Sequence, residues 1–168
     1  RKGKGAHAGA DRAQQFLRVV KRNHGAVYCL KADIAKYFAS IRHAELKEIL
    51  ARHIHCQDSL NLLGLIIDSS PGEPGVGIPL GNLTSQLFAN MYLNELDRFV
   101  KHELRERYYC RYMDDFIVVS HDKVHLADVR QRIEQFLQSR LGLKTNNKTQ
   151  IFPVSKRAGR ALDFLGYR

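Results

Sequence analysis

The chain has no tryptophan, only three cysteines and four prolines, and no apolar run that approaches the length of a membrane span. A spanning helix needs about 18 or more apolar residues in a row, so no membrane partner is expected. The cysteines are odd in number, far apart and without a CxxC pair, which argues against a disulfide framework and a structural zinc site. With no signal peptide visible, we expect a reducing, cytoplasmic location.

Acidic residues are scarce at both ends of the chain. Residues 1–24 hold seven lysines and arginines against one acid, and residues 142–168 hold six against one. Over 168 residues, 27 Lys and Arg against 17 Asp and Glu give a net charge of +10. Such a surplus is typical of domains that bind a polyanion, above all nucleic acid, although an idle basic surface is the alternative. The acids lie mainly in the middle, as a basic groove around an acidic centre would require.

The most informative stretch is YYCRYMDDFIVVS, at residues 108–120. Aromatic and β-branched residues on both sides of Met113, Asp114 and Asp115 predict two strands joined by a tight turn. Adjacent carboxylates between buried segments repel each other and are costly to desolvate unless they are paired or bind a metal. Their oxygens suit Mg²⁺. The alternative is a solvated Asp-Asp hairpin tip.

The spacing of apolar residues predicts the other elements. Helices are expected at residues 11–23, 44–53, 60–67 and 82–104 and before Gly142, strands at 26–34, 149–154 and 162–167, and a basic loop or flexible terminus at 1–9. This order predicts one α+β domain, with a small and mostly antiparallel sheet backed by helices.

Two further features stand near the predicted hairpin. Asp33 closes a strand, where it is either a functional acid at a sheet end or a helix cap. If Asp33 and Asp114 meet at one sheet edge, two or three carboxylates there would fit two cations about 3.5–4 Å apart that serve a phosphoryl transfer. Residues 69–81 form a long loop rich in Gly and Pro that enters a helix. Its backbone could approach a phosphate or a base, but the P-loop lysine is missing.

Five motifs, in this order, resemble those of reverse transcriptases. They are Asp33 followed five residues later by Phe38, IPLGNLTSQ at 78–86, Tyr112-Met113-Asp114-Asp115, the segment 141–149, and FLGY at 164–167. The resemblance covers nearly the whole chain and implies a polymerase palm in residues 26–168. Residues 1–25 would end the fingers, and the thumb and most of the fingers would lie outside this chain, which opens on Arg rather than Met.

The second motif carries a finer resemblance. Leu80-Gly81-x-x-x-Ser85-Gln86 departs from the Gln-Gly-x-x-x-Ser-Pro of most reverse transcriptases and is similar to the enzymes of bacterial and phage diversity-generating retroelements. Leu80 replaces a Gln that in relatives helps to hold the templating pair, and leucine cannot make that hydrogen bond. The resemblance therefore implies error-prone copying, notably opposite template adenines. Group II intron, retron and defence-type enzymes, and a non-catalytic RNA-binding scaffold, are the alternatives.

The resemblance implies roles for the matched residues. Asp33 and Asp114 would bind two Mg²⁺ ions, for which Mn²⁺ could substitute, together with the carbonyl of Ile34. Asp115 belongs to the same motif but is the weaker candidate ligand, because adjacent residues of a strand face opposite sides. The remaining assignments are Phe38 for exclusion of a 2′-hydroxyl (or simply a core residue), Leu80, Gly81 and Gln86 for the nascent base pair, Tyr112 and Met113 for the primer end, and Lys148 or Lys144 as proton donor to pyrophosphate.

The partners that the resemblance implies are a template RNA, a DNA or RNA primer and deoxynucleoside triphosphates. In the resembled family a structured RNA and a small basic accessory protein are also needed.

Overall fold

The computed structural model describes residues 5–79, 81–155 and 160–167. Its elements are α1 (Ala6–His24), β1 (Tyr28–Asp33), α2 (Tyr37–Ser40), α3 (His43–Ala51), α4 (Gln57–Asp68), α5 (Leu83–Arg98) with a π-helical end η1 (Phe99–Glu103), β2 (Tyr109–Tyr112), β3 (Asp115–Ser120), α6 (Lys123–Phe136) with a π-helical end η2 (Leu137–Leu141), and β4 (Gln150–Pro153). The predicted α+β class is confirmed. None of the described helices is long and apolar enough to cross a membrane.

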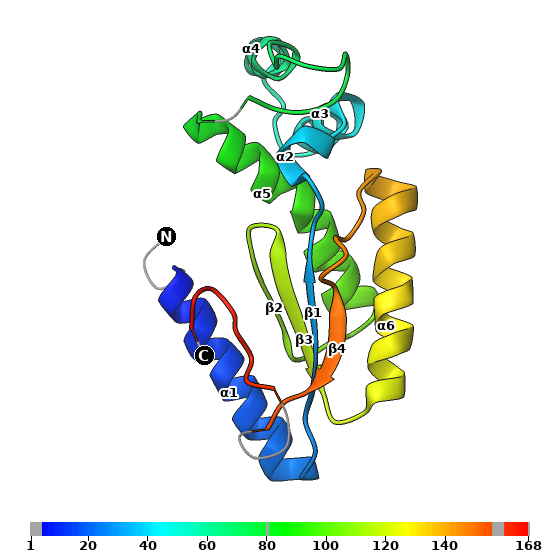
Figure 1. The fold of residues 1–168 in the computed structure, drawn as a ribbon. Helices are drawn as coiled ribbons and strands as arrows, with labels where there is room; N and C mark the ends of the chain where they lie inside the picture. The colour runs from blue at the N-terminus through cyan, green and yellow to red at the C-terminus, as the bar shows by residue number, and fades with distance from the viewer. Residues whose placement is uncertain (1–4, 80, 156–159, 168) are drawn as a thin grey trace.

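The four strands form one antiparallel sheet in the order β2-β3-β1-β4 (Figure 1). Successive side chains of a strand point to opposite faces, so each central strand contributes to two cores. Leu30 and Phe116 are buried in the larger core, together with residues of α5 and α6. Cys29 and Ile117 are buried in a smaller core on the other face, with α1 and the C-terminal segment. We call the second face the α1 face.

The first helix begins at Ala6, so the loop predicted over residues 1–9 is wrong for residues 6–9. Gly9 lies inside the helix, and a Cβ added there would stand 2.7 Å from the side chain of Leu165. The glycine that indicated a loop is therefore a packing glycine, which lets the C-terminal segment approach the helix. Residues 1–4 lie outside the described part of the chain.

The strand predicted over residues 162–167 is also wrong. Phe164 and Tyr167 instead exchange backbone hydrogen bonds of 3.0 and 3.1 Å across a tight turn. Leu162 and Phe164 are buried in the α1-face core, which explains the alternating apolar pattern without a strand. One further difference is α2, a single helical turn that the sequence did not predict.

The ends of the two long helices follow the prediction more closely. Helix α5 with η1 spans residues 83–103 against the expected 82–104. The helix formed by α6 and η2 ends at Leu141, and Gly142 follows it in the left-handed conformation, with φ of 64°, as expected of a glycine after a helix.

Candidate active site

The last residue of β1 and the first residue of β3 stand directly opposite each other. They are Asp33 and Asp115. Directly opposite residues of an antiparallel pair lie on the same face of the sheet. That face is the α1 face, because Cys29 and Ile117 stand two or four residues along the same strands and belong to its core. The expected meeting of Asp33 with the hairpin is thus observed, and alternation does not separate Asp115 from Asp33.

The turn of the hairpin consists of Met113 and Asp114, because Tyr112 and Asp115 already form a pair of the ladder. Met113 has φ of 54°, a left-handed conformation that costs a residue other than glycine about 1–2 kcal/mol. The carbonyl of Asp114 accepts a hydrogen bond from the backbone N–H of Ile34 at 3.3 Å. Asp114 is therefore held beside the end of β1 through its main chain.

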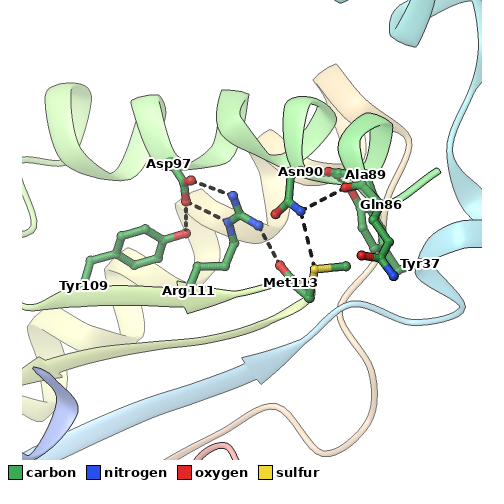
Figure 2. A network of polar contacts seen from close by, with 8 residues as sticks. All are labelled: Tyr37, Gln86, Ala89, Asn90, Asp97, Tyr109, Arg111 and Met113. Atoms are coloured by element: carbon green, nitrogen blue, oxygen red, sulfur yellow. Dashed lines mark hydrogen bonds and ion pairs between the residues drawn. The ribbon is translucent and has the colours of Figure 1, made fainter. Parts of the chain in front are cut away.

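A partly buried ion pair supports this turn (Figure 2). Arg111 donates to the Asp97 carboxylate of α5 through Nε at 2.8 Å and Nη2 at 2.6 Å, and through Nη1 to the Met113 carbonyl at 2.7 Å. Tyr109 donates its hydroxyl to Asp97 Oδ1 at 2.7 Å. Burial lowers the pKa of Arg111, but hydrogen bonds and the charge of Asp97 outweigh burial and raise it. No pattern in the sequence indicated this network.

Helix α5 also contacts the turn through Asn90, which lies nearer the N-terminus of the helix than Asp97 does. Asn90 donates through Nδ2 to the carbonyl of Gln86 at 2.9 Å and to Sδ of Met113 at 3.5 Å (Figure 2). The side chain of Gln86 is exposed. The residue predicted to contact the nascent base pair and the residue predicted to support the primer end are thus linked through one asparagine.

Asp33 has a partner of its own that the sequence analysis did not name. Asn146 donates through Nδ2 to Asp33 Oδ2 at 2.5 Å, and its backbone N–H donates to the Asp33 carbonyl at 2.8 Å. Its side-chain oxygen accepts from the backbone N–H of Lys148 at 2.9 Å. Asparagine commonly bonds the backbone two residues on, so the turn was predictable but the contact with Asp33 was not.

The surroundings of Asp33 and Asp115 disfavour the charged form of their carboxylates. Burial, followed by the charge of Asp114, raises the pKa of Asp33. Burial raises the pKa of Asp115 to about 6, although Lys31, with its Nζ at 3.8 Å, opposes the rise. Oδ1 of Asp115 is buried without a hydrogen-bond partner. A cation would relieve all of these costs, so the residues fit a metal.

These residues fit a metal in the chemistry of their oxygen donors, but they do not form a complete coordination shell by themselves. Within residues 5–79, 81–155 and 160–167, no group of three or more His, Cys, Asp or Glu side chains is placed to hold an ion alone. Mg²⁺ usually binds through one or two carboxylates and takes its other ligands from waters and substrate phosphates. Asp33 and Asp114, with the neighbouring Ile34 backbone, fit that kind of site, while their ligand roles stay predictions.

Phe38 lies in α2, half-buried against the larger core. Its carbonyl accepts from the N–H of Ile78 at 3.0 Å, and the carbonyl of Ile41 accepts from Gly77 at 2.7 Å. The glycine-rich loop is therefore hydrogen-bonded to α2 and to the residue after it. These bonds bring the motif that contains Phe38 next to the motif that begins at Ile78. Gly81 is exposed with φ of 92°, a conformation that favours glycine. Leu80 lies outside the described residues.

The other predicted site residues are at the surface. Tyr112 is 41% exposed, and both Lys144 and Lys148 are exposed. The carbonyl of Lys144 accepts from the N–H of Ala35 at 2.9 Å, whereas Lys148 is tied to Asn146. Both lysines thus flank Asn146, the residue that holds Asp33.

The chain is similar to a known protein family and to two curated proteins. The model of the family "reverse transcriptase (RNA-dependent DNA polymerase)" matches residues 1–168. Protein YkfC of Escherichia coli is 26% identical over 181 residues, which cover 84% of this chain and 46% of YkfC. An uncharacterized 91 kDa protein in the cob intron of Schizosaccharomyces pombe is 30% identical over 83 residues, 46% of this chain and 10% of that protein. The chain thus spans less than half of these curated relatives.

Solved telomerase structures share the fold. The apo telomerase of Candida tropicalis, truncated from its C-terminal domain, superposes with a TM-score of 0.67 at 18% identity, over 94% of this chain and 36% of that one. The telomerase of Candida albicans, in complex with a TWJ fragment of telomeric RNA, gives 0.70 at 14% identity, over 96% and 32%. At these identities the likeness concerns the fold alone.

Proposed function

Because the chain belongs to the reverse transcriptase family, we propose that it is the palm of an RNA-directed DNA polymerase that joins deoxynucleotides by Mg²⁺-dependent nucleotidyl transfer. The observation that carries the proposal is the register pair of Asp33 and Asp115 beside the Asp114 turn. Three acids at one sheet edge of a chain with a net charge of +10 have a use in catalysis on a polyanion, and they would only weaken simple binding.

In this proposal Asp33 and Asp114 hold the ions, with Asp115 and the carbonyl of Ile34 as supporting ligands. Bound Mg²⁺ supplies Lewis-acid stabilisation of the transferred phosphoryl group. Asn146 holds the Asp33 carboxylate, and the backbone of Ile34 holds the Asp114 main chain, so the two acids are oriented before substrate arrives.

The substrate contacts follow from the same proposal. Phe38 excludes a 2′-hydroxyl by its bulk and so selects deoxynucleotides, and Leu80, Gly81 and Gln86 line the nascent base pair. Tyr112 and Met113 support the primer end. Lys148 or Lys144 donates a proton to the leaving pyrophosphate. Template RNA, a DNA or RNA primer and deoxynucleoside triphosphates are the corresponding partners, and a small basic accessory protein is a further one.

The decisive experiment is primer extension on an RNA template with Mg²⁺, using the whole protein that carries this chain. Asp114→Ala should abolish synthesis while RNA binding stays at the parent level. Asp128→Ala, at an exposed acid on α6, is the matched control and should leave synthesis unchanged. RNA binding without synthesis by the parent would favour a non-catalytic scaffold, and normal synthesis by Asp114→Ala would refute the site.

For the subtype we propose an error-prone enzyme of a diversity-generating retroelement, on the strength of Leu80 and of Gln86 in the second motif. Sequenced products should show excess errors opposite template adenines, and Leu80→Gln should reduce them because glutamine restores a hydrogen-bonding group. Faithful copying by the parent would instead favour an intron- or retron-type enzyme. The fission yeast relative, which is described as lying in an intron, supports that second candidate.

A further inference from the structure

The turn that carries Asp114 is held from the side of α5 by residues without a role in the reaction proposed above. Nε and Nη2 of Arg111 are both bound to Asp97, which fixes the plane of the guanidinium. Nη1 then points to the carbonyl of Met113 at 2.7 Å. A lysine could not make this set of bonds, because its single ammonium group lacks the rigid fork.

The carbonyl that Arg111 binds belongs to the strained residue of the turn. Met113 has φ of 54°, and two-residue hairpin turns of this kind usually have glycine at such a position. Strained backbone persists at functional sites only where its surroundings hold it. The next residue is Asp114, so the orientation of the Met113–Asp114 peptide decides where that carboxylate stands.

The other end of the network is firmly placed. Asp97 follows Leu96, which is fully buried, and it also accepts the hydroxyl hydrogen bond of Tyr109. The side chain of Arg111 is only 9% exposed and that of Asp97 23%. A partly buried ion pair contributes little net stability compared with an apolar pair, but the two-point contact of Arg111 with Asp97 fixes the geometry of this one.

We infer that Arg111, held by Asp97, is a positioning residue: it fixes the left-handed turn at Met113 and thereby sets the Asp114 carboxylate against Asp33. The inference rests on the proposed function for its catalytic consequence, although the effect on the turn does not depend on it.

The test compares Arg111→Lys with Tyr92→Phe in the whole protein. The lysine keeps the charge but loses the fork. Tyr92→Phe removes another buried hydrogen bond of α5, from the hydroxyl to the Leu141 carbonyl at 2.7 Å, and leaves the turn untouched. Amide hydrogen exchange of the metal-free proteins should be faster at residues 112–116 in Arg111→Lys, with α6 unchanged, and should equal the parent in that turn in Tyr92→Phe.

In RNA-templated extension, Arg111→Lys should lower kcat by about 100-fold, the loss expected from a misplacement of roughly 1 Å, with the KM for deoxynucleotides near that of the parent. The swap Asp97→Arg with Arg111→Asp keeps an ion pair but leaves the Met113 carbonyl without its donor. A double variant that folds should therefore still be inactive in extension. Recovery of activity by the swap, or parent-like exchange at the turn in Arg111→Lys, would overturn the inference.

The two proposals can fail separately. A parent protein that makes no DNA would refute the proposed function, while the exchange experiment would still decide whether Arg111 holds the turn. Normal synthesis by both the parent and Arg111→Lys would refute the positioning role and leave the polymerase in place.

Discussion

Asp33 and Asp114 stand at the same sheet edge but are held in different ways. The carboxylate of Asp33 accepts a direct hydrogen bond from Asn146 at 2.5 Å. Asp114 is held through its main chain, by Ile34 at its own carbonyl and by Arg111 at the carbonyl before it. Asn146 thus holds Asp33 at both its side chain and its carbonyl, whereas Asp114 is held through backbone carbonyls of its turn. The difference indicates that the Asp33 carboxylate is positioned by a direct partner, whereas the Asp114 carboxylate is positioned through the backbone of its turn.

The largest expected effect is loss of the carboxylate itself. Asp33→Asn should lower the rate of DNA synthesis on the order of 1,000-fold or more, because a carboxylate that holds an ion supplies several kcal/mol of transition-state stabilisation. Single-turnover extension at saturating deoxynucleotide measures the rate. Asp33→Asn and Asp114→Asn should be equally inactive, however differently the acids are held, and residual activity in only one would show that the two do not share the ions.

The side-chain support of Asp33 should matter less than the acid. Asn146→Ala removes the hydrogen bond to Asp33 and should lower activity or apparent Mg²⁺ affinity by about 10–100-fold, the usual effect of losing a partner of a metal ligand. A Mg²⁺ titration of extension rates separates the two effects. Asn147→Ala, at the exposed neighbouring position, is the control. Equal activity of both variants would show that Asp33 needs no support.

Asp115 provides a test that requires no activity. Burial raises its pKa to about 6 in the folded protein, so the folded state binds this proton more tightly than the unfolded state. The resulting stabilisation is complete below a pH of about 4 and is lost as the pH rises through 6. In EDTA, Asp115→Asn should therefore raise the free energy of unfolding by about 2 kcal/mol at pH 8 and by almost nothing at pH 4.

Urea unfolding at the two pH values measures this difference, with Asp128→Asn as the exposed control. If Asp115 also binds Mg²⁺, saturating Mg²⁺ should favour the parent over Asp115→Asn at pH 8. A variant that is no more stable than the parent in EDTA at pH 8 would contradict the buried, partnerless carboxylate oxygen.

The smallest effect is expected at a second ion pair of α5, between Arg52 and Glu95. Arg52 and Glu95 lie 3.3 Å apart with the arginine side chain 48% exposed, so solvent screens the pair. Arg52→Met should change the free energy of unfolding by less than about 1 kcal/mol and leave synthesis unchanged. A loss of activity comparable to that of Arg111→Lys would mean that α5 is sensitive to any charge change and that the turn is not specifically held.

The parts of the fold that the sequence predicted are those with a local signal. The strand, turn and strand at residues 109–120 follow from aromatic and β-branched residues, and Gly142 marks the end of its helix. Local signals also misled: Gly9 indicated a loop where it serves packing against Leu165, and the apolar residues Leu162 and Phe164 indicated a strand where they only fill a core.

The candidate site divides in the same way. Its acids could be predicted because their residue types and order resemble a known family. The residues that hold those acids in place could not be predicted, because the contact between Asn146 and Asp33 joins residues 113 positions apart, and Arg111 reaches Asp97 on a different element. Such contacts arise from tertiary packing, and neither composition nor periodicity carries a signal for them.

The central position of β1 has a consequence for how the chain acquires its shape. Asp33 pairs with Asp115, and the difference of 115 − 33 is 82 residues, so β1 leaves the ribosome long before its neighbour β3 exists. At synthesis rates of roughly 5–20 residues per second, β1 waits about 4–16 s for that partner. Long-range strand pairing is slow because loop closure must precede the contacts that reward it. The acidic edge therefore cannot form until β3 has been made, by which time α2 to α5, which lie between the two strands in sequence, already exist.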